Sequence, residues 1–247
     1  MKNLTLSPSQ INTFLRCQLQ WKFRYIDEIK VPPKPSMVVG TSFHKTMEKN
    51  FKHKIEKKED LPLDLVEDIY NQEFEKGIEE VDEKPDEKEL GKIKDTGYKV
   101  TKKYRTEVAP KIFPEKVEAH SIKEIEKGLS IQGYSDLIVK NTVIDFKVVN
   151  QKSTKITTDY QLQLEAYKFL FEEIKKAQIH KAVQTKTPQI LILNVNLPKS
   201  NERIINLSKK IAKVIKQGEF LPSGLGHTWA CDYCGYKRLG LCKYNKG

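Results

Sequence analysis

The sequence predicts an α/β protein in which helices flank a central group of strands. Helix signals open the chain at Pro8 and return at Tyr160–Lys175 and Ile204–Ile215, whereas strand-like alternation of apolar and polar residues fills the segment from 117 to 149. The 247 residues are enough to bury the core of one large domain. We therefore expect a single domain over residues 1–247.

The first helix has a clear start signal. Ser7 stands at the N-cap position, Pro8 suits the first helical position, and Gln10 completes a capping box. Leu6 and Ile11 occupy the two positions of a hydrophobic staple. These features predict a helix that begins at Pro8 and reaches Cys17.

More helices are expected in the next hundred residues. A proline-rich break at residues 31–35 is followed by Gly40–His44, which we expect to open the second helix. Residues 60–108 are rich in Glu and Lys and predict two or three helices around a charged bend at Val81–Glu89. We interpret about 55–112 as a helical insertion with a solvated, charged surface.

Strand signals dominate the middle of the chain. Val117–Ile125 and Leu129–Val139 flank a Lys-Gly turn, and Thr142–Val149 follows a second tight turn. Further on, Ala182–Asn196 contains the continuous apolar run Ile190–Leu193, which is typical of a buried strand. Together these segments predict the sheet.

Charge and missing motifs limit the possible functions. The formal net charge is +11, although Glu73–Asp95 holds ten acids against five lysines, so the rest of the chain is strongly basic. Such a surface suits a polyanion, although lysine-rich proteins are often basic without binding nucleic acid. Membrane-span and signal-peptide patterns are missing, which favours a cytoplasmic protein. A phosphate-binding loop is missing too, which argues against motor activity.

Two aspartates are expected to face each other across a hairpin. If Lys140 and Asn141 form its two-residue turn, Val139 pairs with Thr142, and Asp136 falls opposite Asp145. Two carboxylates so placed repel each other unless a cation lies between them. Mg²⁺ or Mn²⁺ suits such an oxygen-rich site.

Lys147 lies two residues beyond Asp145 and therefore on the same strand face. A lysine beside a metal-bound carboxylate can orient an attacking water or stabilise the charge that develops on a phosphate. The arrangement suits phosphodiester hydrolysis. A solvent-facing hairpin with ordinary charged residues is the alternative.

Other candidate residues are ambiguous one at a time. Gln163 and Tyr167 lie one helical turn apart and can both donate hydrogen bonds, although a surface Gln and a boundary Tyr would look the same. His44 could be a structural histidine or a ligand, and Glu118 is an ordinary strand residue if taken alone.

The order of these residues resembles the RecB-like branch of the PD-(D/E)XK superfamily, which includes the AddB and RecB nuclease domains and the CRISPR-associated RecB-like exonucleases. The resemblance spans nearly the whole chain except the charged insertion. Its motifs are weak singly and informative as an ordered set. In this chain they are Leu6–Ile11 with Cys17, Gly40–His44, Glu118, Gly133–Asp136, Ile144–Lys147 and Gln163–Tyr167.

The resemblance implies a restriction-endonuclease-like mixed sheet flanked by helices, and cleavage of DNA with one or two metal ions. It implies that the metal ligands are His44, Asp136, Asp145 and the backbone carbonyl of Phe146, and that Lys147 is catalytic.

The same resemblance adds further residues to the active site. Gln163 and Tyr167 match its glutamine–tyrosine helix. Glu118 matches its early acidic residue, with Glu115 as a competing match.

Four cysteines suggest a second metal site. Cys17 lies far from Cys231, Cys234 and Cys242 in the sequence, whereas a zinc ribbon usually has two local pairs. This split resembles the RecB-like nucleases that carry a 4Fe–4S cluster, with zinc as the alternative. Here seven residues separate Cys234 from Cys242, a longer loop than in those nucleases. The implied cluster would join Cys17 to residues 229–247 as a staple between the two ends.

The expected function is that of a metal-dependent DNA nuclease, an exonuclease acting on single-stranded ends in repair, recombination or CRISPR adaptation. A non-catalytic DNA-binding scaffold subunit is the alternative. Because no helicase segment is present, we expect duplex unwinding to need a partner, such as a helicase or a CRISPR-adaptation protein.

Overall fold

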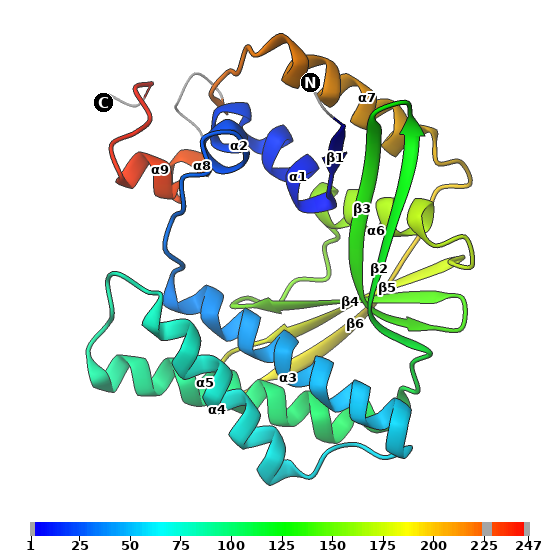
Figure 1. Ribbon diagram of the computed structural model, residues 1–247. Helices are drawn as coiled ribbons and strands as arrows, with labels where there is room; N and C mark the ends of the chain where they lie inside the picture. Colours follow the sequence, from blue (N-terminus) through cyan, green and yellow to red (C-terminus); the bar gives the residue numbers. More distant parts are fainter. Residues whose placement is uncertain (1–2, 224–228, 245–247) are drawn as a thin grey trace.

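A computed structural model of the protein describes residues 3–223 and 229–244 (Figure 1). Its helices and strands are, in chain order, β1 (Leu4–Leu6), α1 (Pro8–Arg16), α2 (Gln18–Tyr25), α3 (Pro35–Lys57), α4 (Leu63–Glu79), α5 (Glu87–Glu107), the 3-10 helix η1 (Ala109–Lys111), β2 (Lys116–Glu126), β3 (Leu129–Val139), β4 (Thr142–Val149), α6 (Thr158–Leu170), β5 (Lys176–Val183), β6 (Gln189–Val195), α7 (Glu202–Gln217), α8 (Trp229–Asp232) and α9 (Gly235–Arg238). No helix of these described segments is long and apolar enough to cross a bilayer.

The predicted start of the first helix is confirmed. The Ser7 hydroxyl accepts a hydrogen bond from the Gln10 amide at 3.2 Å, and Leu6 and Ile11 are fully buried. The Gln10 side chain does not close the capping box, because it donates to the Thr5 carbonyl instead. The staple fixes the path from β1 into α1.

The sheet is mixed and has β3 at its branch point. β2 pairs with β3 in antiparallel fashion along almost its whole length. Along the other edge of β3, the parallel strand β1 pairs with Leu129–Ile131, and the antiparallel strand β4 pairs with Leu137–Val139. β5 continues in parallel beside β4, and β6 closes the edge. Residues 132–136 therefore lie between two ladders, where the sheet forks.

Helices cover both faces of this sheet, as predicted for an α/β protein (Figure 1). One face packs on α1, α6 and α7 through a core that includes Ile131, Tyr167 and Ile211. The opposite face packs on α3 and α5. α4 packs against α3 and α5, with Val66, Tyr70, Phe74 and Ile78 buried. The result is a three-layer arrangement with an added helix.

Several boundaries differ from the sequence prediction. α3 begins at Pro35, so Gly40–His44 lies inside this helix instead of opening it; proline is well tolerated in the first turn. α6 ends at Leu170, and a turn over residues 171–175 replaces the expected end of this helix before β5 begins.

The run Ile190–Leu193 is not a buried strand. It belongs to β6, and Ile192 is 48% exposed. β6 pairs with β5 in antiparallel fashion at the edge of the sheet, and antiparallel strands commonly have one packed face and one face in solvent.

The predicted helices between 60 and 108 are α4 and α5, and the predicted charged bend at Val81–Glu89 connects them, although α5 already begins at Glu87. These helices form a charged surface and also contribute to the buried core. Tyr104 of α5 is fully buried, with ring contacts to Phe43 and Phe146. α5 thus supports the strand that carries Asp145.

Candidate active site

Asp136 lies at the fork between β3 and β4. The predicted hairpin register is confirmed for three pairs, from Val139 with Thr142 to Leu137 with Ile144. The ladder ends there, so the prediction that Asp136 and Asp145 are direct partners is wrong. Instead, the Asp136 Oδ2 atom accepts a hydrogen bond from the Phe146 amide at 2.6 Å. The Asp136 carboxylate thus takes the place of the next backbone hydrogen bond of the ladder and holds β4 where it diverges from β3.

His44 reaches Asp136 from the neighbouring helix α3. Its Nδ1 atom lies 3.2 Å from the Asp136 Oδ1 atom. Burial acts to lower the pKa of His44, but the charge and hydrogen bond of Asp136 raise it above its usual value. Burial likewise opposes ionisation of Asp136, but His44 and Lys147 lower its pKa. The pair is therefore biased toward its charged form.

Asp145 and Lys147 form a second pair on β4, as their alternation predicted. The Lys147 ammonium lies 2.6 Å from the Asp145 Oδ2 atom. Burial, followed by repulsion from Asp136, raises the pKa of Asp145 although Lys147 acts to lower it. The pKa of Lys147 is raised because Asp145 and Asp136 outweigh its burial. The two aspartates thus interact electrostatically even though they are not ladder partners.

The α6 helix completes the network through Gln163. Its Oε1 atom accepts from Lys147 at 3.0 Å, while its Nε2 atom donates to Asp145 Oδ1 at 2.8 Å and to the Tyr167 hydroxyl at 2.7 Å. Gly133 permits the close approach of α6, because a Cβ atom there would lie 3.3 Å from the Tyr167 ring and 3.0 Å from Leu170. The predicted pair on α6 therefore orients both β4 residues.

Glu118 has a strained backbone on β2. Its φ angle is 49°, in the left-handed region that costs a non-glycine residue about 1–3 kcal/mol. The flanking pairs of β2 with β3 place Glu118 opposite Asp136. Burial, with repulsion from Asp136 and Glu48, raises the pKa of Glu118. Glu118 lines the cleft described below, whereas Glu115 is exposed and is not among its lining residues.

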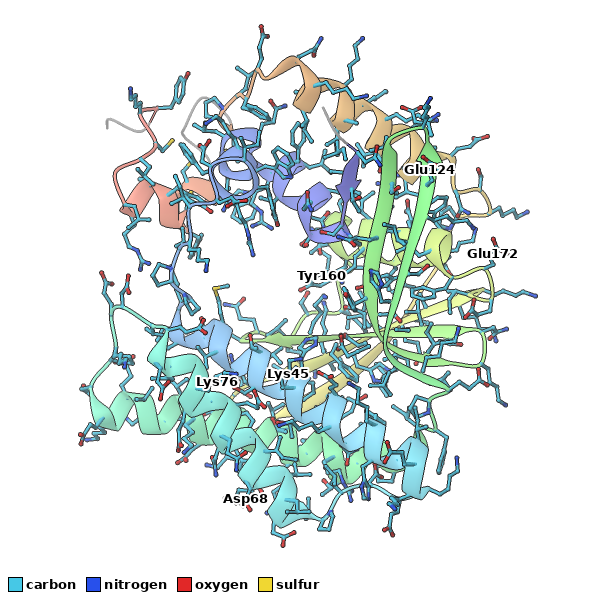
Figure 2. All side chains as sticks on the ribbon, in the orientation of Figure 1. Lys45, Asp68, Lys76, Glu124, Tyr160 and Glu172 are labelled. Atoms are coloured by element: carbon cyan, nitrogen blue, oxygen red, sulfur yellow. The ribbon has the colours of Figure 1, made fainter. Side chains whose placement is uncertain are left out.

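His44, Glu118, Asp136 and Lys147 line a cleft of about 540 Å³, whereas Asp145 is buried and is not among the lining residues. Its lining residues on α3 are Met37, Gly40, Thr41, His44, Lys45 and Glu48, and those on the strands are Glu118, Tyr134, Asp136, Phe146, Lys147 and Val148. Figure 2 labels Lys45 on α3. The sequence analysis missed Glu48, although it follows His44 by one helical turn, a spacing that places both on one face.

Tyr160 was also missed. Its ring lies between two lysines, with its centroid 5.4 Å from the Lys147 Nζ atom and 5.6 Å from that of Lys181 (Figure 2). The Lys181 ammonium also donates to the carbonyls of Ser153 and Lys155. The connection between β4 and α6 is thus anchored next to the catalytic candidate Lys147.

The donor set fits a divalent cation chemically. Asp136 and Asp145 offer carboxylate oxygens, the ligand type that suits Mg²⁺ and Mn²⁺, and His44 adds an imidazole nitrogen. In the described segments, no three His, Cys, Asp or Glu side chains converge as a metal ion would require. The acids are bound to His44 and Lys147 instead. Burial and repulsion from Asp136 raise the pKa of Asp145, and a cation between the two aspartates would oppose both effects.

The four cysteines are all described and partly buried. Cys17 separates α1 from α2. Cys231 lies in α8 and Cys234 is the N-cap residue of α9, and the Cys234 amide donates to the Cys231 carbonyl. Tyr236 contacts the ring of Phe23, so the tail lies against α2, as Figure 1 shows. As stated above, these thiols do not converge as a ligand group within the described residues.

Comparison with known proteins identifies the family of this site. Residues 5–241 match the model of the PD-(D/E)XK nuclease superfamily. The chain belongs to this superfamily. The match to the superfamily includes every active-site candidate named above. No curated protein sequence matches the chain significantly.

Two solved structures share the superfamily fold with this chain. One is a Eubacterium rectale protein for which exonuclease activity has been proposed; its TM-score is 0.60 at 15% identity, covering 93% of this chain and 87% of the other. The other is SSO0001, with a TM-score of 0.50 at 14% identity, covering 97% of this chain and 85% of the other. At such identities the likeness concerns the fold alone.

Proposed function

We propose that this protein is a metal-dependent DNA nuclease, and more specifically an exonuclease that hydrolyses single-stranded DNA ends. One observation carries the proposal: Asp145, Lys147 and Gln163 are bound to one another, and Lys147 lines the same cleft as the His44–Asp136 pair. A structural ion pair would not need the second carboxylate, Asp136, whose repulsion adds to burial in raising the pKa of Asp145.

The proposed metal ligands are His44, Asp136, Asp145 and the carbonyl of Phe146. A bound Mg²⁺ or Mn²⁺ would lower the pKa of a water molecule and offset the charge of the phosphate. The Asp136 contact to the Phe146 amide supports the carbonyl's assignment, because it fixes the backbone at that residue. Glu118 is held beside Asp136 by a strained backbone and is proposed to add negative charge to the same site.

Lys147 is proposed to orient the attacking water and to stabilise charge on the phosphate. Its ammonium is positioned by Asp145 and by Gln163 Oε1. Gln163 is in turn held by Tyr167. Tyr167 is thus a positioning residue, which fixes the amide orientation of Gln163 and so keeps its oxygen toward Lys147 and its nitrogen toward Asp145.

DNA is the proposed substrate because the chain is basic, at +11 overall, and because the superfamily is one of nucleases. The exonuclease proposed for the Eubacterium rectale relative supports action at ends. We propose that a helicase or a CRISPR-adaptation protein supplies those ends.

The decisive experiment follows end-labelled single-stranded DNA, linear and circular, with Mn²⁺ or Mg²⁺ and with EDTA. Wild type should degrade the linear strand only with metal, and Asp145→Asn should lose this activity. Asp68→Asn, an exposed aspartate on α4 (Figure 2), is the matched control and should retain it. Labels at the 5′ and 3′ ends report the polarity.

Degradation of circular DNA would replace the exonuclease proposal by an endonuclease. Inert wild-type protein that still binds DNA would favour the scaffold function. Metal binding has its own readout: saturating Mn²⁺ at about 100 times its Kd should stabilise wild type by about 2.7 kcal/mol, and Asp145→Asn should lose most of this gain. An equal gain in both proteins would contradict the assigned ligands.

We also propose that Cys17, Cys231, Cys234 and Cys242 bind a 4Fe–4S cluster. The packing of Tyr236 on Phe23, and its hydrogen bond to the Ile29 carbonyl, bring the tail to the helix that follows Cys17. Cluster binding requires the thiols to move closer together than they are here. Anaerobically purified protein should be brown and contain iron, and Cys234→Ser should lose both. Colourless protein with stoichiometric zinc would overturn the cluster.

A further inference from the structure

We propose that the stacked side chains of His120 and Tyr134 bind an unpaired nucleobase next to the cleaved phosphate. This inference rests on the proposed nuclease function and assigns its preference for single strands to a particular surface. The two residues lie on the β2–β3 hairpin, which rises from the fork of the sheet (Figure 1).

The two rings form a well-defined pair. His120 and Tyr134 are direct cross-strand partners, their ring centroids are 4.5 Å apart, and their planes are inclined by 29°. Tyr134 is nevertheless 57% exposed, and His120 is exposed as well. The imidazole thus supports one part of the phenol ring while the pair remains open to solvent.

The pair belongs to the same surface as the active site. Tyr134 lines the cleft, and it precedes Asp136 by two residues, so both side chains leave the same face of β3. The separation along the strand is about 7 Å, which is the length of about one nucleotide in an extended single strand. A phosphate held beside Asp136 would therefore place its neighbouring base near Tyr134.

The core does not require these aromatic rings. The opposite face of the hairpin makes the packing contacts: Gly133 lies against α6 and Ser121 donates to the Leu170 carbonyl. An exposed aromatic pair on the cleft side is suited to stacking with any base, because every base has a π face. In duplex DNA that face is covered by neighbouring base pairs. The pair therefore favours unpaired ends.

The hairpin also indicates how far this surface extends. Beyond the pair, Ile122 is 55% exposed on the same face and could contact a second base. Glu124, which lies further along the hairpin (Figure 2), carries a negative charge that repels phosphate. We therefore assign the strongest contact to a single base at Tyr134.

The test measures the coupling between one base and one side chain. Linear single-stranded oligonucleotides carry an abasic nucleotide at successive positions from the cleaved end, and kcat/KM and metal-free binding are measured for each. For wild type, one abasic position should cost about 10-fold, within the range of a lost base–aromatic stack. On intact DNA, Tyr134→Val should show a similar loss of kcat/KM and of binding. On DNA that lacks this base, the variant should show no further loss.

Three variants serve as controls. Tyr134→Phe keeps the ring and should behave like wild type. Valine keeps strand propensity at residue 134, so thermal unfolding should show Tyr134→Val to be folded. Phe113→Val alters an aromatic residue that is 61% exposed and does not line the cleft; it should leave the abasic profile unchanged.

The outcomes separate this inference from the proposed function. If wild type degrades DNA but the effects of Tyr134→Val and the abasic nucleotide multiply independently at every position, the base site is wrong and the nuclease stands. If DNA is bound with the predicted coupling but is never cleaved, the base site stands and the nuclease function is wrong. A protein that neither binds nor cleaves single-stranded DNA contradicts both.

Discussion

The neighbouring parallel strands β4 and β5 bury similar side chains and use them differently. Phe146 and Lys147 of β4 lie beside His180 and Lys181 of β5 in the same register. Lys147 binds a carboxylate and lines the cleft. Lys181 instead donates to two backbone carbonyls, and burial lowers its pKa.

The difference shows that the partner of a buried lysine determines its role more than the residue type does. On β4 the partner Asp145 raises the pKa of the lysine, which lines the cleft. On β5 the polar groups are satisfied inside the protein. His180 is held between Tyr104 and Gln178, and Lys181 anchors the connection that leads to α6.

Of the substitutions that compare β4 with β5, the exchange of Lys147 for methionine should have the largest effect. Lys147→Met removes the cation proposed to stabilise the phosphate, and we expect kcat for DNA cleavage to fall by about 1,000-fold. Single-turnover cleavage with saturating Mn²⁺ measures it. A loss below about 10-fold would mean that Lys147 only compensates the charge of Asp145.

Lowering the pH should reduce the free energy of unfolding through protonation of His180. Burial lowers its pKa to about 4, against about 6.5 in the unfolded chain. The unfolded state therefore binds more protons between these values, so stability is retained above pH 6.5 and falls by about 3 kcal/mol by pH 4. Urea unfolding from pH 7 to pH 4 should show this slope, and His180→Gln should flatten it. Equal slopes would show that other groups dominate.

Lys181→Met tests the structural lysine directly. It leaves the carbonyls of Ser153 and Lys155 without their charged donor, and we expect the free energy of unfolding to fall by about 2 kcal/mol. Cleavage activity should change by less than about 5-fold, in contrast to Lys147→Met. If activity falls as far as in Lys147→Met, the distinction between the two strands is wrong.

The smallest effect is expected at Tyr160, which contacts both lysines. Tyr160→Leu removes two cation–π contacts, each worth about 0.5–1 kcal/mol when partly exposed. We expect a loss of about 1 kcal/mol in unfolding free energy and a few-fold lower kcat. Tyr160→Phe keeps the ring and should match wild type in both measurements, whereas a defect in Tyr160→Phe would assign the role to the hydroxyl.

Local signals account for the parts that the sequence analysis predicted. The β3–β4 hairpin follows from a two-residue turn between alternating strands, and the pairing of Gln163 with Tyr167 follows from helical spacing. These features depend on residues close together in the chain. They sufficed to predict the cluster of Asp136, Asp145 and Lys147 and the α/β class.

Long-range packing explains what was missed. β5 was not recognised because Lys176, His180 and Lys181 make it look polar, although His180 and Lys181 are buried with partners from distant segments. The fork at Asp136 depends on where β1 joins β3, which no local pattern encodes. Glu48 reaches the cleft because α3 packs beside β2 and β4, a contact between segments far apart in the chain.

The placement of β1 has a consequence for the order of folding during synthesis. β1 is three residues long and pairs with β3 at Leu129–Ile131, so its partner is made more than a hundred residues later. A ribosome needs on the order of 10 s for that stretch. During this time Leu6, which is fully buried in the folded protein, has no β3 residue to pair with. The helices α3 to α5 have already been synthesised by then and can form. The nascent chain therefore passes through a stage in which its first apolar strand is open to chaperones.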